Sequence, residues 1–325
     1  PGRGPPMNWR RLARVAGLGA AGLLFVVAAL LGWLYLDAQR DRVDWFHERH
    51  GSLAAVEREV LDAAPALTAE RVRLQSTSGL AVTLRVLRPR AQEEPLPVLM
   101  LLGGHRTGAD AVELFESVDQ RIVVALDYPY DGPLKTRTLL TTLGAVPAIR
   151  RAFLDAAPAI WLATDWLAAQ DWADAERIAL AGVSLGVPFA ATAAAHDERI
   201  AALLLVHGAA DNRAWVEHNI ARRNDLGTLL GPAATLGNWL VYGDLHDTDR
   251  HVAMLSPRPV VIVGASADER VPPGQAEMLY AAAGEPKSLR WTDGRHVQTG
   301  RREVVDELMA LADEELGRLV APAAR

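Results

Sequence analysis

The chain has 325 residues, of which 23% are charged, and this length allows one sizeable globular domain with an appendage. The formal net charge is −6 and there is no dense basic block, which argues against nucleic-acid binding because neutralising phosphates needs clustered Lys and Arg. The absence of cysteine excludes disulfides, thiolate catalysis and Cys-ligated zinc. Arginine far outnumbers the two lysines, Lys135 and Lys287, and alanine is abundant, a composition that suggests a GC-rich bacterial genome.

An uncharged apolar run from Val15 to Leu36 predicts a transmembrane helix. At 1.5 Å per residue, a helix of about 22 residues spans roughly 33 Å, enough to cross the hydrocarbon core of a bilayer. The alternative is a cleaved signal peptide, but the run exceeds the usual length of about 7 to 15 residues and no clear cleavage site follows it. We therefore expect an uncleaved anchor in contact with the lipid bilayer, with Trp33 and Tyr35 at the interface.

The charges around this run predict its orientation. The segment from Asp37 to Asp44 is mixed in sign, whereas four arginines precede the run: Arg3, Arg10, Arg11 and Arg14. The positive-inside rule then places residues 1–14 in the cytoplasm and everything after Leu36 in the periplasm or outside the cell. We expect residues 37–69, which include the helix-like SLAAVEREVLDAA, to form a juxtamembrane stalk or helix. A chain starting between Asp37 and Ser52 should then contain the complete core.

The remainder, residues 70–325, has the pattern of an α/β domain. Two alternating stretches, Arg71 to Gln75 and Ala81 to Leu87, predict an antiparallel hairpin at a sheet edge. Short apolar runs then alternate with helical stretches, as in a mostly parallel sheet covered on both faces. The runs are Pro97 to Leu102, Ile122 to Leu126, Ile178 to Ala181, Ala201 to Val206 and Val260 to Val263, with a short last strand near Leu289 to Trp291. The helical stretches are Gly108 to Gln120, Val146 to Gln170, Leu185 to His196 and Arg301 to Val320.

The connection between the last two apolar runs is about 50 residues long, from Gly208 to Pro257. Insertions of that size usually carry function, so we expect this segment to form a cap over the site.

One serine stands where an apolar run gives way to a helical stretch. Gly182 and Gly186 flank Ser184 as GxSxG, the spacing of a nucleophile elbow, in which the serine sits on a strained strand-to-helix turn. A small residue that merely eases the turn is the alternative. In an open α/β sheet the ligand site lies at the carboxyl ends of the strands, so residues that directly follow the apolar runs are the candidates for its partners.

Reading those positions gives one base and two acids. The order serine, acid, histidine leaves His296 as the histidine downstream of Asp268, and Asp211 is the rival acid after the preceding run. The segments AGVSLG, GASADERVPP and DGRH together resemble the α/β-hydrolase superfamily over roughly Ala69 to Arg325. Within it, AERIALAGVSLG is most similar to dienelactone-hydrolase-type and related bacterial carboxylesterases, with some similarity to the catalytic domain of prolyl-oligopeptidase-like enzymes.

The resemblance implies an eight-stranded, mostly parallel sheet flanked by helices, with a helical cap. It implies Ser184 as nucleophile, His296 as general base and acid, and Asp268 as the residue that orients His296. The oxyanion hole would combine the Leu185 N–H with a donor after the first apolar run. Where many members of the superfamily have His-Gly, this chain has Gly103, Gly104 and His105, so His105 is the favoured donor and Gly104 the other option. Tyr128 and Tyr130, at a strand end, are candidate pocket residues.

No cofactor is expected, because a serine triad needs no metal. The segment HDTDRH, residues 246–251, could be read as metal ligands, but such sets in a polar loop are usually solvated or capping. The expected activity is therefore hydrolysis of a small-molecule carboxylic ester by a membrane-anchored serine esterase. The alternatives are a peptidase or amidase of the same fold and a non-catalytic protein that keeps the fold. The sequence leaves the oligomeric state open.

Overall fold

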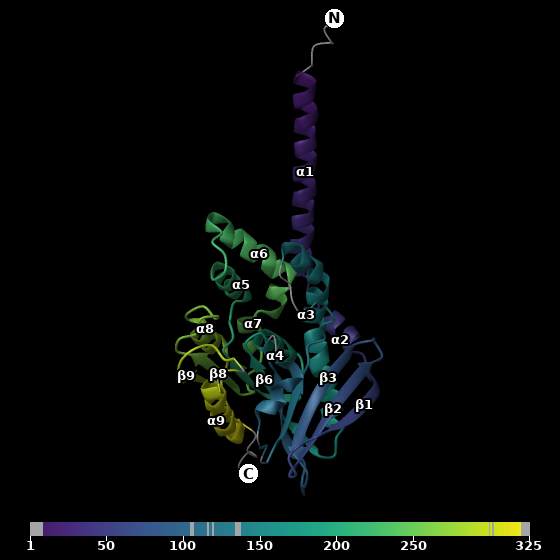
Figure 1. The fold of residues 1–325 in the computed structure, drawn as a ribbon, viewed down its shortest axis with the longest axis vertical. Coiled ribbons are helices and arrows are strands. Elements are labelled where there is room, and N and C mark those ends of the chain that lie inside the picture. The colour runs from purple at the N-terminus through teal and green to yellow at the C-terminus, as the bar shows by residue number, and fades with distance from the viewer. Residues whose placement is uncertain are drawn as a thin grey trace, which may run out of the picture.

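The computed structural model describes residues 9–104, 107–115, 117–118, 120–133, 138–298, 300 and 302–319. A nine-stranded sheet lies at its centre, in the order β1-β2-β3-β5-β4-β6-β7-β8-β9 (Figure 1). From β4 onward, at least one helix lies between each strand and the next along the chain. The pairings from β5 to β9 in this order are all parallel. The strands are β1 Leu53–Leu61, β2 Leu67–Ser76, β3 Ala81–Pro89, β4 Leu96–Leu102, β5 Ile122–Leu126, β6 Ala173–Val183, β7 Ile200–Val206, β8 Val260–Ala265 and β9 Lys287–Thr292.

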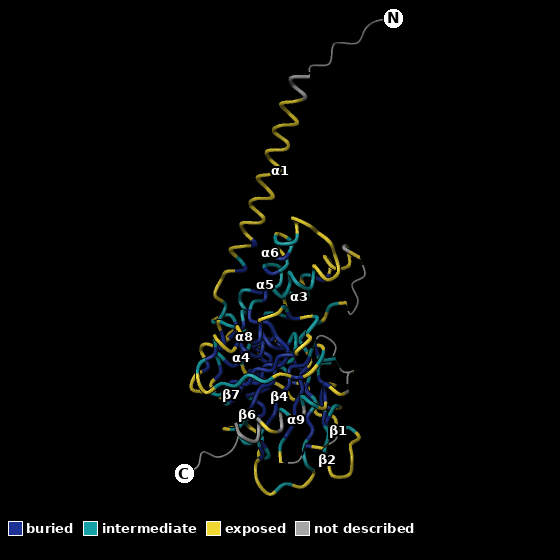
Figure 2. Tube along the Cα trace, turned by 90° about the vertical axis from the view of Figure 1, so that its left-hand side faces the viewer, coloured by how far each residue is buried: buried dark blue, intermediate teal, exposed yellow. Residues whose placement is uncertain are grey.

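Helices cover both faces of the sheet, which is why the central strands are apolar throughout. Val98 and Met100 of β4 face a core built with α2, α3, α4, α7 and α8, while Leu99 and Leu101 face a second core with η1 and α9. The buried centre is the dark blue region of Figure 2. These helices are α2 Val43–His50, η1 Gly108–Leu114, α3 Leu139–Ala168, α4 Gly186–Ala195, α7 Thr248–Val252, α8 Gln275–Ala282 and α9 Arg302–Leu319. The arrangement confirms the predicted mostly parallel α/β fold.

The first strand corrects two expectations. The stretch Leu53–Leu61, expected to be helical, is an edge strand that pairs antiparallel with β2, so the sheet has nine strands and not eight. Its side chains are mostly exposed, so no apolar face marks it as a strand; backbone pairing with β2 outweighs its helix propensity.

The helix expected over 108–120 is a shorter 3-10 helix, Gly108–Leu114.

The segment after Leu36 is also more integrated than a stalk would be. Phe46 of α2 is fully buried in the larger core. Arg49 donates from Nε and Nη2 to the two carboxylate oxygens of the buried Asp155 on α3, at 2.7 and 2.8 Å. The expectation that a chain starting as late as Ser52 holds the complete core is therefore wrong, because Phe46 and Arg49 belong to it.

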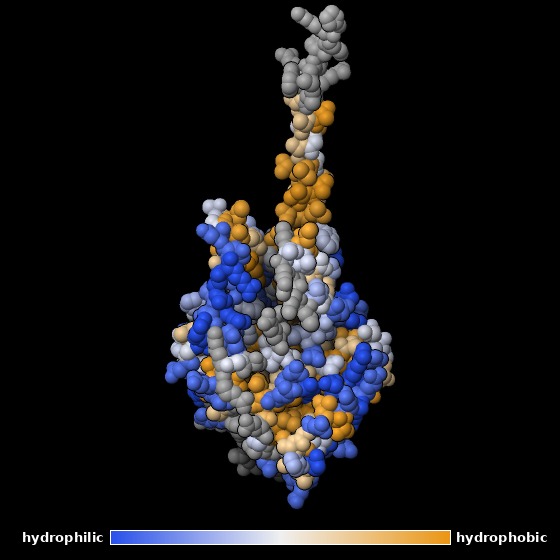
Figure 3. Space-filling model, in the orientation of Figure 1, coloured by the Kyte–Doolittle hydropathy of each residue, from blue (hydrophilic) through white to orange (hydrophobic). Residues whose placement is uncertain are grey.

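Helix α1, Trp9–Ala38, projects from this body (Figures 1 and 3). Its stretch Ala13–Ala38 is long and apolar enough to cross a membrane, although a signal sequence would pass the same test. The last turn of α1 is fixed to the domain through Asp37, which binds Arg42 at 2.6 Å and Arg150 of α3 at 2.5 Å. The Tyr242 hydroxyl donates to the same carboxylate at 3.1 Å.

The connection between β7 and β8 is helical, as expected for the cap. It contains α5 Asn212–Ala221, η2 Gly227–Leu229, α6 Leu230–Leu240, η3 Gly243–His246 and α7. In Figure 1, α5 and α6 stand above the carboxyl ends of the parallel strands, on the side from which α1 emerges.

Candidate active site

Ser184 sits on the sharp turn between β6 and α4. Its φ of +55° lies in the left-handed region, which a serine adopts only under constraint. The flanking glycines make the turn possible: a Cβ on Gly186 would lie 2.1 Å from the carbonyl oxygen of Leu102, and one on Gly182 would lie 2.7 Å from the Ala190 Cβ. The GxSxG pattern therefore reflects close backbone packing around a strained serine.

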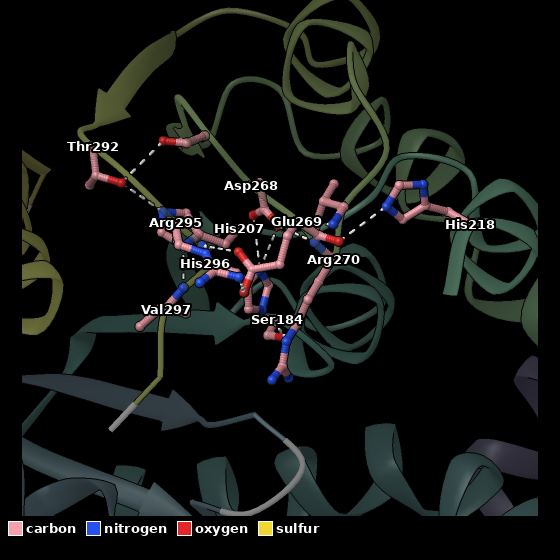
Figure 4. A network of polar contacts seen from close by, with 12 residues as sticks. Ser184, His207, His218, Asp268, Glu269, Arg270, Thr292, Arg295, His296 and Val297 are labelled. Atoms are coloured by element: carbon pink, nitrogen blue, oxygen red, sulfur yellow. Dashed lines mark hydrogen bonds and ion pairs between the residues drawn. The ribbon is translucent and has the colours of Figure 1, made fainter. Parts of the chain in front are cut away.

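The structure brings Ser184, His296 and Asp268 together, although 112 residues separate the serine from the histidine (Figure 4). The Ser184 Oγ lies 2.8 Å from His296 Nε2. On the other side of the ring, His296 Nδ1 lies 2.8 and 3.0 Å from the two oxygens of Asp268. The His296 side chain is 1% exposed and that of Asp268 9%, so both are shielded from bulk water. This geometry allows a proton to pass from the serine hydroxyl to an imidazole oriented by a carboxylate.

The loop after β8 holds the Asp268 carboxylate in its ionised form. Burial acts to raise the pKa of Asp268, but the hydrogen bond and charge of His296 and the backbone N–H groups of Val271 and Arg270 outweigh it and lower that pKa. The two N–H groups donate to Asp268 Oδ1 at 2.9 and 2.7 Å. A fixed carboxylate of this kind selects the imidazole tautomer with hydrogen on Nδ1.

The rival acid, Asp211, has another task. It is the N-cap of α5, and its Oδ1 accepts a hydrogen bond from the Ala214 N–H at 2.9 Å. Asp268 is the acid in contact with His296.

His207, which follows β7 directly, is a site residue that the sequence reasoning missed. It is buried, has a φ of +51°, and its ring centre lies 5.7 Å from that of His296. Its Nδ1 accepts the N–H of Val297 at 3.0 Å, so Nε2 carries the hydrogen and donates to Thr292 Oγ1 at 2.9 Å. Burial and the neighbouring His296 lower the pKa of His207 to about 4, so the ring is neutral at neutral pH. Its place directly after an apolar strand was the available signal.

Two groups of residues could be taken for metal ligands. His207, Asp268 and His296 offer atoms within 4.8 Å of one another, but the hydrogen bonds given above already use the ring nitrogens. In the segment 246–251, His246 contacts Thr192 Oγ1 and the Phe153 carbonyl at 2.9 and 3.0 Å, and His251 donates to the Leu245 carbonyl. Both of these histidines are buried and pack the cap onto the domain.

The predicted oxyanion donors lie around the same turn. Leu185 directly follows the serine and is the N-cap of α4, so its N–H is at the positive end of that helix. Gly104 passes beside the serine, since a Cβ built on it would lie 3.7 Å from the Ser184 Cβ. His105 lies outside the described residues.

Tyr128 supports the loop after β4, and Tyr130 lies along its own turn. The Tyr128 hydroxyl donates to the Gly103 carbonyl at 2.7 Å, and burial raises the pKa of Tyr128, which keeps the hydroxyl protonated. The Tyr130 hydroxyl donates to the Pro133 carbonyl at 3.0 Å. Tyr128 therefore helps to fix the backbone of Gly103, the residue directly before Gly104.

Comparison with known proteins agrees with this fold. Residues 157–301 match the prolyl oligopeptidase family, a span of slightly less than half the chain. The uncharacterized protein YfhR of Salmonella typhi is 29% identical over 123 residues, which are 38% of this chain and 41% of YfhR, so well under two thirds of that relative's length is matched.

Solved structures share the fold over most of the chain. The acetyl xylan esterase from Paenibacillus sp. R4 has a TM-score of 0.58 at 16% identity, covering 82% of this chain and 90% of the esterase. Acetyl xylan esterase 1 from Thermoanaerobacterium sp. JW/SL YS485 has a TM-score of 0.59 at 15% identity, covering 86% and 93%.

The fold and the site define the class: this protein is a serine hydrolase with the α/β-hydrolase fold. Within that class, residues 157–301 are similar to the prolyl oligopeptidase family, and the overall fold is similar to that of acetyl xylan esterases.

Proposed function

We propose that the protein is a membrane-anchored esterase that cleaves a carboxylic ester through an acyl-enzyme. The observation that carries this proposal is the 2.8 Å contact between Ser184 Oγ and His296 Nε2, with Asp268 on the other ring nitrogen. The named structural neighbours are esterases acting on acetylated xylan, which supports an ester substrate. The similarity to dienelactone-hydrolase-type carboxylesterases expected from the sequence belongs to the same proposal.

The chemistry follows from the positions of these groups. His296 Nε2 takes the hydroxyl proton of Ser184 as Oγ attacks the ester carbonyl, and Asp268 stabilises the resulting imidazolium. The N–H groups of Leu185 and of Gly104 or His105 stabilise the oxyanion. The imidazolium then protonates the leaving alcohol. Water, deprotonated by His296, hydrolyses the acyl-enzyme and regenerates the serine.

A peptidase or amidase is the second candidate, because residues 157–301 match the prolyl oligopeptidase family. Amide and ester cleavage use the same triad, so the triad does not distinguish between the two activities. Tyr128 and Tyr130 remain candidate pocket residues in either case.

The test pairs an active-site probe with matched substrates. A fluorophosphonate should label the intact chain at Ser184 and leave Ser184→Ala unlabelled. Esters and amides with the same acyl groups should then be compared, and we expect the ester series to be turned over faster. Preferential cleavage of the amides would replace the esterase proposal with the peptidase one. No labelling at Ser184 in folded protein would remove both.

Residues 15–36 of α1 are proposed to anchor the chain in the bilayer, with residues 1–14 in the cytoplasm and the hydrolase domain in the periplasm or outside the cell. The length and apolarity of α1 and the four preceding arginines support this topology. Protease treatment of spheroplasts should digest the hydrolase domain. A mature chain that begins just after Leu36 would instead indicate a cleaved signal peptide.

A further inference from the structure

The cap carries an apolar end on the side of the molecule from which α1 emerges. The α5–α6 turn, residues 221–229, is exposed throughout, and its Leu226 and Leu229 side chains are 37% and 65% exposed. Leu236 of α6 is also 37% exposed. Figure 3 shows apolar surface over α6, facing the same end of the molecule as the apolar helix α1.

The other end of α6 is attached to α1. The Trp239 ring of α6 lies 5.2 Å from the Tyr35 ring of α1. Just beyond the two helices, Gln39 donates to Asp244 of η3 at 2.5 Å. Because α6 meets α1 near its own C-terminal end, its N-terminal end at Leu230 slants up and away from the base of α1, toward the end of the molecule from which α1 projects (Figure 1). The α5–α6 turn is thus held at a fixed level relative to α1.

A second apolar element lies at that level. Helix α3 begins beside the lower end of α1, and its Leu140 and Leu143 are 82% and 53% exposed. Arg150, further along α3, binds Asp37, so the start of α3 is fixed to α1 as well. Exposed leucines therefore stand on two elements around the base of one apolar helix.

The charges of the turn favour a lipid surface over a purely apolar partner. Arg222 and Arg223 are exposed and stand shortly before Leu226 in the chain. One acidic residue, Asp225, lies between these arginines and Leu226. Leucines that enter the acyl boundary beside arginines that meet lipid headgroups are typical of interfacial membrane contacts.

We propose that the leucines of the α5–α6 turn and of the start of α3 insert into the interface of the same bilayer that holds α1. This rests on the proposed anchoring of α1. The cap would then reach from the lipid surface to the catalytic loop, since His218 and Asn219 of α5 donate to the Glu269 and Arg270 carbonyls at 3.2 and 2.9 Å. An ester that leaves the bilayer at this point would contact the cap without first crossing bulk water.

The lack of native cysteine allows a direct test with single labels. Leu229→Cys and Leu140→Cys in the full chain would carry an environment-sensitive fluorophore in single-copy nanodiscs of phosphatidylcholine and phosphatidylglycerol. Val26→Cys in α1 is the positive control. Glu93→Cys is the aqueous control, because it follows β3 at the end of the sheet opposite the cap. Fluorophosphonate labelling verifies that each variant is folded.

We expect blue-shifted emission and loss of iodide quenching at positions 229 and 140, as at 26, with position 93 fully quenched. Full quenching at 229 and 140 while 26 is protected would overturn the interfacial contact and leave the anchor intact. Quenching at 26 as well would overturn the anchor. The same labels should also be measured in vesicles that hold many copies of the protein. If positions 229 and 140 were protected from iodide in these vesicles but quenched in single-copy nanodiscs, a second protein copy would cover them, which would also overturn the proposal.

Discussion

His207 Nδ1 accepts a hydrogen bond from the backbone N–H of Val297, the residue that follows His296. The same ring donates to Thr292, at the end of β9. One buried histidine therefore forms hydrogen bonds at both ends of residues 292–297, the segment that contains His296. His296 itself donates its backbone N–H to Glu269 in the acid loop, at 3.0 Å. His207 is thus a positioning residue for His296 and does not touch the reacting serine.

Replacing His207 should impair turnover more than substrate binding. We expect His207→Leu to lower kcat by about 10- to 100-fold with little change in KM, because a small displacement of His296 lengthens its contact with Ser184. His207→Gln can restore one of the two hydrogen bonds and should recover part of that loss. His251→Gln, at another buried histidine remote from the serine, is the matched control. Equal losses of kcat in His207→Leu and His251→Gln would assign His207 a merely structural role.

The two candidate acids should separate clearly on substitution. Asp268→Asn should lower kcat by up to about 10⁴-fold, because an amide favours the wrong imidazole tautomer. Asp211→Asn keeps an N-cap residue on α5 and should leave kcat near that of the wild type. Steady-state kinetics on one ester decide between them, and a larger loss in Asp211→Asn would show that the acid was misassigned.

The catalytic arrangement was largely predictable because it depends on local patterns. A strand buried on both faces needs a continuous apolar run, and the parallel strands end at one edge, so the residues after the runs of β6 and β8 had to meet there. GxSxG was informative because the packing of Gly186 against Leu102 excludes any larger residue.

The missed features depend on contacts between distant segments. His207 acts on a residue 90 positions later, and no local pattern shows that its Nδ1 will face Val297. Strand β1 is exposed on both faces, so only its pairing partner makes it a strand. Phe46 was misassigned to a stalk because a single aromatic residue among charged ones does not reveal which core it enters.

The elbow glycine should be intolerant of even a methyl group. In Gly186→Ala the new Cβ would meet the Leu102 carbonyl at 2.1 Å, and backbone must move on both sides. We expect a loss of stability of about 1 to 3 kcal/mol or more, with loss of fluorophosphonate labelling. Gly231→Ala is the control, since nothing lies within 4 Å of that position and α6 is helical there. Urea unfolding should show Gly231→Ala unchanged or up to about 1 kcal/mol more stable, and similar losses in both variants would contradict the packing argument.

Buried histidines should make the fold sensitive to acid. Burial lowers the pKa of His207 and His251 to about 4 and that of His246 to about 3, all below the ordinary value of 6.5. Between pH 6.5 and about 4, each of these histidines is therefore protonated in the unfolded chain but neutral in the native one. The stability that these histidines contribute should be fully present above pH 6.5 and fall by about 1.4 kcal/mol per pH unit for each histidine as the pH drops through that window. Urea unfolding at several pH values measures the slope. His251→Gln should lower the slope by about 1.4 kcal/mol per pH unit, and an unchanged slope would mean that His251 is protonated in the native state.

The domain should fold without α1 but not without α2. A chain that begins at Asp37 keeps the bonds from Asp37 to Arg42 and Arg150 and should be soluble and active. A chain that begins at Ser52 loses Phe46 from the core, at a cost of about 3 to 5 kcal/mol, and leaves the buried Asp155 without Arg49, at a similar cost. Together these approach the whole stability of a typical domain, so the shorter chain should aggregate or stay unfolded. Phe46→Ala in the Asp37 chain isolates the packing contribution and should lower the urea midpoint without abolishing activity. If the Ser52 chain were as stable and active as the Asp37 chain, α2 would be dispensable and its burial against α3 would contribute little to the fold.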